Sequence, residues 1–69
     1  MKTINEAEAA LRQELQKYRW FKFIGINQTE KRLIVYVGED KGMIAENVVS
    51  QSYEGYKVTV QEIGDIVAS

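Results

Sequence analysis

Cysteine and histidine are both absent from this 69-residue sequence. Without cysteine the chain cannot form a disulfide, and without either residue it lacks the usual ligands of a structural zinc site. The same absences remove the side chains that most often act as nucleophile or general base in catalysis. We therefore expect a domain that is not an enzyme and that uses no metal, cofactor or small-molecule substrate.

Long hydrophobic runs are absent as well. The longest apolar stretch is five residues, from Leu33 to Val37, whereas a helix that crosses a bilayer needs about 20. The opening segment, Met1 to Glu6, becomes acidic where a secretory signal peptide would become apolar. These features predict a cytoplasmic protein with no membrane segment.

Neither sign of charge dominates, since nine residues are basic and ten are acidic, and 45% of the residues are hydrophobic. This composition is typical of a globular chain, and its length allows one hydrophobic core, so residues 1–69 are expected to form a single domain. Apolar burial in such a chain contributes on the order of 105 kcal/mol, and ordering the chain costs about as much. Because no disulfide or zinc site can add stability, we expect association, most simply with a second copy.

A helix is predicted at residues 3–18. Thr3 and Glu6 have the spacing of a capping box, in which each side chain bonds a backbone N–H at the start of a helix. Apolar residues then recur at steps of three and four, with charged residues on the opposite side. This apolar stripe consists of Ile4, Ala7, Leu11, Leu15 and Tyr18.

Three strands and a second helix follow. Aromatic and β-branched residues predict strands at 20–28, 32–38 and 56–63, separated by polar or glycine-containing turns. Residues 41–52 place apolar side chains at helical spacing and predict the second helix. The expected fold is α+β, an αββαβ two-layer sandwich in which a three-stranded sheet carries both helices on one face.

The first strand is expected to lie in the centre of the sheet, because it has apolar side chains on both faces. The predicted strand order is therefore 2-1-3, and an order of 1-2-3 is the alternative. The predicted core includes Leu11, Leu15, Ile24, Ile26, Val35, Val58 and either Met43 or Ile44.

The sheet face without helices is the candidate interface. If Ile24 and Ile26 face the helices, other apolar strand residues should line the uncovered face, although a one-residue register shift would exchange the two sets. Aromatic-rich surfaces are typical of interfaces. The candidate interface residues are Phe21, Phe23, Ile34, Tyr36 and, near the rim, Tyr56. We therefore expect a non-catalytic interaction or accessory module that self-associates through this face or binds another protein.

Basic and aromatic residues interleave in the segment 17–23, which supports an alternative function. Cations that attract the phosphate backbone, next to rings on which bases stack, are what a single-stranded nucleic-acid site requires. The residues in question are Lys17, Arg19, Trp20 and Lys22. The acidic isoelectric point and slightly negative net charge favour the protein-interaction hypothesis over this one.

Two pairs of acidic residues are candidate ligands of a divalent cation: Glu39 with Asp40, and Glu62 with Asp65. Neither pair has the spacing of a calcium-binding loop. Glu39 and Asp40 precede the second predicted helix, where negative charges interact favourably with the positive end of the helix dipole. We therefore expect no metal site.

Two stretches of strand sequence carry a family resemblance. They are FIGI at 23–26 followed by LIVYV at 33–37, and YEGYKVTVQEIGDI at 53–66. The chain resembles small bacterial α/β modules that occur alone or ahead of trypsin-like serine peptidase domains. Those modules often have proline where this chain has Lys57. The resemblance implies the α/β fold and a non-catalytic accessory or interaction role, with no catalytic residue carried over.

Overall fold

The first helix, α1 (Ile4–Leu15), begins at the predicted capping box. In the computed structural model, which describes residues 2–64, Thr3 N–H donates to Glu6 Oε1 at 3.0 Å and Glu6 N–H donates to Thr3 Oγ1 at 3.1 Å. The helix ends before the predicted residue 18, and its C-cap is Gln16. Its buried residues are those of the predicted stripe except Tyr18: Ile4, Ala7, Leu11 and Leu15.

The capping box makes stability depend on pH. The hydrogen bond from Thr3 N–H, and then the bond with the Thr3 side chain, hold the pKa of Glu6 below its usual 4.5. A lowered pKa means that the carboxylate stabilises the fold above the unfolded-state pKa and stops doing so as the pH falls through the folded-state value. We expect Glu6→Gln to be less stable than wild type near neutrality, with a difference that shrinks on acidification. Urea unfolding of both proteins from about pH 7 to about pH 3 measures this, and a constant difference would contradict it.

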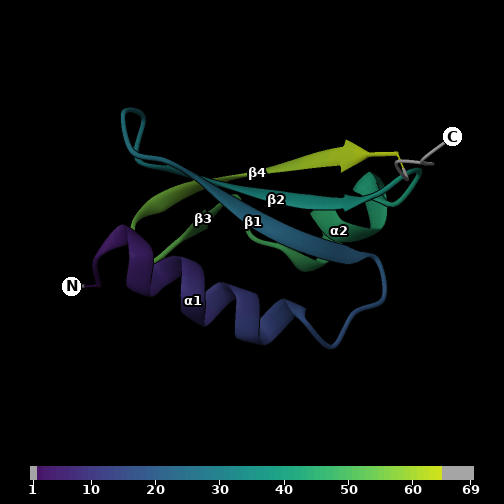
Figure 1. Cartoon of the computed structure of the whole chain (residues 1–69), viewed down its shortest axis with the longest axis horizontal. Helices are drawn as coiled ribbons and strands as arrows, with labels where there is room; N and C mark the ends of the chain where they lie inside the picture. Colours follow the sequence, from purple (N-terminus) through teal and green to yellow (C-terminus); the bar gives the residue numbers. More distant parts are fainter. Residues whose placement is uncertain (1, 65–69) are drawn as a thin grey trace, which may run out of the picture.

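Five further elements complete an αββαββ arrangement: β1 (Phe21–Asn27), β2 (Arg32–Gly38), α2 (Gly42–Val48), β3 (Ser52–Tyr53) and β4 (Tyr56–Ile63). The strands form one mixed, curled sheet, and α1 runs alongside β1 (Figure 1). β1 pairs antiparallel with β2, β2 pairs parallel with β4 through the α2 crossover, and β3 pairs antiparallel with β4. The α+β class and two helices are as predicted.

The predicted strand order 2-1-3 is wrong. The observed order is β1-β2-β4-β3, so β2 is central and β1 is an edge, and the three long strands follow the 1-2-3 alternative. A right-handed crossover from β2 is compatible with either order, and therefore handedness could not decide between them. Burial decides it, because Leu33, Val35 and Val37 of β2 are fully buried whereas every residue of β1 is partly or largely exposed.

The short strand β3 was not predicted. Its two residues are joined to β4 by a two-residue turn at Glu54 and Gly55, whose φ values of 52° and 86° are those of the turns that best fit hairpins. The sequence predicts only a glycine-containing turn ahead of the strand at 56–63. Burial raises the pKa of the Tyr53 hydroxyl, and a hydrogen bond to Glu14 raises it further, so this contact connects β3 to α1.

The hydrophobic core lies between the helices and one face of the sheet. Leu11, Leu15 and Val35 are buried as predicted, and Ile24, Ile26 and Val58 are partly buried against them. The prediction that Met43 or Ile44 belongs to the core is wrong, because the two side chains are 78% and 46% exposed. Helix α2 begins one residue later than predicted and ends four residues earlier, and the side of the helix opposite to the predicted one faces the sheet. The side chains buried there are Ala45 and, just beyond the helix, Val49.

The beginning of α2 is capped from the neighbouring strand. Glu62 Oε2 accepts a hydrogen bond from Gly42 N–H at 2.8 Å, whereas the N-cap residue Lys41 makes no side-chain cap. A Cβ at residue 42 would lie 2.6 Å from that oxygen, so glycine allows the close approach. Neither α1, with 12 residues, nor α2, with 7, is long and apolar enough to cross a membrane.

Candidate binding face

One side of the sheet faces the helices and the other does not. Ile24 and Ile26 lie opposite the buried Val35 and Leu33, so these four residues point toward the helices and alternate positions point away. We call the second side the open face. Its side chains are Phe23, Asn27, Arg32, Ile34, Tyr36, Lys57, Thr59, Gln61 and Ile63.

An aromatic pair lies at the β1–β2 side of the open face. The rings of Phe23 and Tyr36 are stacked, with centroids 4.5 Å apart and an interplanar angle of 26°. Phe23 is 50% exposed although it belongs to a strand. The Tyr36 ring lies over Gly25, where a Cβ would be 3.0 Å from its Cε2 atom. Glycine at this position therefore provides the space that the Tyr36 ring occupies.

We expect Gly25→Ala to destabilise the domain by about 1 kcal/mol, because the new methyl group forces the Tyr36 ring out of place. Gly38→Ala is the matched control, since a Cβ at that β2 position would have no neighbour closer than 3.6 Å. Where no such contact arises, alanine is favoured over glycine in a strand, so Gly38→Ala should be neutral or slightly stabilising. Urea unfolding compares the two variants, and equal stability would show that the ring moves without cost.

Two predicted interface residues lie away from the open face. A register shift between Phe21 and Phe23 inserts Lys22 as an extra residue, so Phe21 lies opposite the buried Val37 and packs against the core. Tyr56 also packs against the core, and its hydroxyl donates to the Lys2 carbonyl at 2.8 Å. Of the five candidate residues, Phe23, Ile34 and Tyr36 share the open face.

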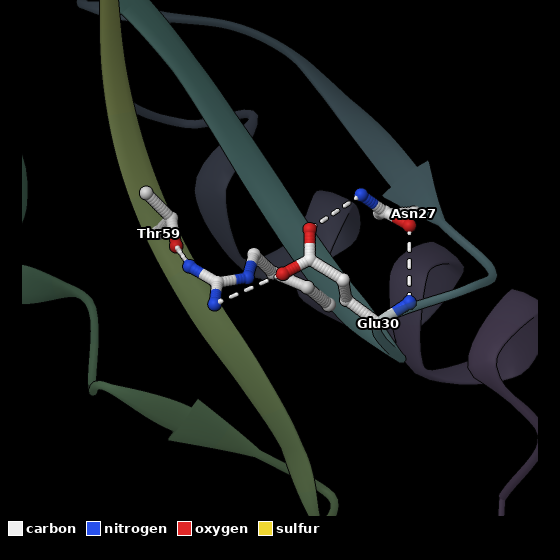
Figure 2. Close-up of polar contacts among 4 residues, drawn as sticks. Asn27, Glu30 and Thr59 are labelled. Atoms are coloured by element: carbon white, nitrogen blue, oxygen red, sulfur yellow. Dashed lines mark hydrogen bonds and ion pairs between the residues drawn. The ribbon is translucent and has the colours of Figure 1, made fainter.

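Arg32 anchors the polar part of the open face, a role that the sequence analysis missed. Its Nη1 donates to Thr59 Oγ1 at 2.8 Å, and its Nη2 lies 3.6 Å from Glu30 Oε1 (Figure 2). Glu30 is held in turn by Asn27, which donates to its carboxylate and accepts from its backbone N–H. The spacing of Asn27 and Glu30 indicates the turn between β1 and β2. The contact of Arg32 with Thr59, in contrast, depends on the parallel register of β2 and β4.

The basic and aromatic segment 17–23 brings three of its four candidate nucleic-acid residues into one pocket. Trp20 is half-buried, and its ring stacks on Tyr18 with centroids 4.7 Å apart. Lys17 Nζ lies 5.3 Å from the Tyr18 ring centroid. Arg19, Trp20 and Lys22 line a pocket of about 370 Å³ that lies away from the open face. Its other lining residues come from the end of β2, the turn that follows and α2: Gly38, Glu39, Lys41 and Ile44.

The carboxylates of the described residues show no grouping suited to a cation. Among residues 2–64, no three acidic side chains lie close enough to hold a metal ion. Glu62 caps α2, as described above, while Glu39 and Asp40 are exposed beside the β2–α2 turn. Asp65, the second member of one predicted pair, lies outside the described residues.

Comparison with protein-family models, curated proteins and solved structures finds no match for this chain. Its most distinctive surface is the open face, which combines exposed aromatic rings with cationic side chains.

Proposed function

We propose that this protein is a non-catalytic interaction module that self-associates through its open face. The half-exposed Phe23, stacked on Tyr36, is the observation that carries the proposal. Ile34 lies on the same face, so aromatic and aliphatic surface is available where no helix covers the sheet. Burial of such surface between two copies supplies the stabilisation that a small domain without disulfides needs.

Light scattering after size exclusion tests self-association directly. Over about 5 to 500 µM, the measured mass should rise from one chain to two as concentration increases, because a dimer is favoured by mass action. Amide chemical shifts recorded over the same range should change at Phe23, Ile34 and Tyr36. A one-chain mass throughout, with the domain folded, would refute self-association and leave a different protein as the partner.

Single-stranded nucleic acid is the second candidate, because the strand positions of the open face include Arg32 and Lys57 and no carboxylate. Exposed rings on the same face suit base stacking. The two candidates make opposite predictions for Lys57→Gln. Removing a cation weakens binding to phosphates, whereas it relieves repulsion between two copies that bring like charges together.

Titration of labelled single-stranded DNA and RNA at low and high salt completes this comparison. Binding that weakens steeply with salt and falls further in Lys57→Gln supports the nucleic-acid candidate. Lys2→Gln is the matched control, since Lys2 is also exposed but precedes α1 and lines neither the open face nor the pocket that contains Arg19, Trp20 and Lys22. A stronger dimer in Lys57→Gln, together with no nucleic-acid binding, supports self-association.

A further inference from the structure

The outer edge of β4 is mostly unpaired. On this side β3 pairs only with Tyr56 and Lys57, and Val58 N–H donates to the Gln51 carbonyl at 2.9 Å. Beyond that point, no described segment pairs with the outer side of β4. Because backbone groups alternate along a strand, the N–H and C=O groups of Val60 and Glu62 point outward like those of Val58. The Glu62 carbonyl accepts a hydrogen bond from Gln61 Nε2 at 3.2 Å, and the other groups of these two residues make no backbone hydrogen bond to a described segment on that side.

The β1 edge of the sheet is protected against pairing with another strand, whereas the outer edge of β4 is not. β1 has a bulge at Lys22, and bulges and lysine residues both discourage another strand from pairing with an edge. β4 pairs with β2 in unbroken register, and its outer stretch contains no proline or lysine. The contrast indicates that β4 is an edge suited to pairing.

A groove of about 510 Å³ follows this edge. On the helix side it is lined by Val49, Val58 and Val60, which are apolar. On the open-face side it is lined by Thr59 and by two cations, Lys57 and Arg32. The remaining lining residues come from α2 and the segment after it: Glu46, Ser50 and Gln51.

We propose that the β4 edge binds an extended peptide segment of another protein as a fifth strand, in which apolar residues alternate with acidic ones. Side chains of an added strand alternate between the two faces of the sheet. One set would therefore lie against the valines of the groove, and the other would lie beside Arg32 and Lys57. Among the described residues that line the groove, Glu46 is the only carboxylate, and it lies on α2. Arg32 already pairs with Glu30 at 3.6 Å, so Lys57 supplies most of the attraction for negative charge on the open-face side. This peptide site shares Arg32, Lys57 and Thr59 with the open face, but it does not include Phe23 and Tyr36, on which the self-association proposed above depends.

The probe is a labelled seven-residue peptide, blocked at both ends, that alternates valine with glutamate. Fluorescence polarisation should detect its binding, and a valine–lysine peptide should bind at least about tenfold more weakly. A valine–glutamate peptide N-methylated at the residues that would donate to β4 should also lose at least about tenfold in affinity, because main-chain hydrogen bonds supply much of the affinity in strand addition. Amide shifts of Val60 and Glu62 should move on binding.

A charge exchange provides the decisive variant. The Lys57 side chain is exposed and makes no hydrogen bond or ion pair with the described residues, so Lys57→Glu should fold normally. This variant should bind the valine–lysine peptide more tightly than wild type does, while Lys41→Glu should leave both affinities unchanged. Equal binding of the N-methylated peptide, shifts confined to Phe23 and Ile34, or no binding up to about 1 mM would overturn the proposal.

Discussion

Leu33→Ala is expected to lower the free energy of unfolding by about 3 kcal/mol, which is a large part of the stability of a domain this small. Leu33 is fully buried at the centre of the sheet, and truncating it leaves a cavity that β2 cannot close because strands pair with it on both sides. Urea or thermal unfolding followed by circular dichroism measures the loss.

Ile26→Ala is the matched comparison, because Ile26 lies directly opposite Leu33 in the β1–β2 register but on the edge strand. Ile26 is only partly buried, so its truncation should cost clearly less. With β1 in the centre, as the 2-1-3 order required, the two costs would be similar. A similar cost in practice would therefore contradict the observed position of β2.

The sequence could predict those elements whose signals are local. The capping box of Thr3 and Glu6 and the alternation from Arg32 to Gly38 depend on neighbouring residues, and both are confirmed. Strand order depends instead on which edges meet after the α2 crossover, and no local spacing encodes that choice. The two-residue strand β3 is too short to show any periodicity, although its turn at Glu54 and Gly55 was readable.

The open face was predictable to the same limited extent. Alternation along β2 placed Ile34 and Tyr36 together, and the register of β1 places Phe23 beside Tyr36. Phe21 was misplaced because one extra residue at a bulge moves every side chain before it to the opposite face. The contact of Arg32 with Thr59 joins residues 27 positions apart, and it could not be read without the parallel register.

Phe23→Ser is expected to weaken self-association by at least tenfold, or about 1.4 kcal/mol. An aromatic ring that is exposed in the monomer and buried in the dimer is typical of the few residues that dominate an interface. The monomer should remain folded, because Phe23 lies on an edge strand and is 50% exposed. Light scattering over the concentration range given above measures the change, and circular dichroism verifies the fold.

Met43→Ser separates a specific contact from general hydrophobicity. Met43 exposes even more of its side chain than Phe23, at 78%, but it belongs to α2 on the helix side of the sheet. Its replacement removes apolar surface without touching the open face, so the dimer should be unchanged. If Met43→Ser weakens association as much as Phe23→Ser does, the open face is not the interface, and the exposed residues of α2 become the surface on which two copies meet.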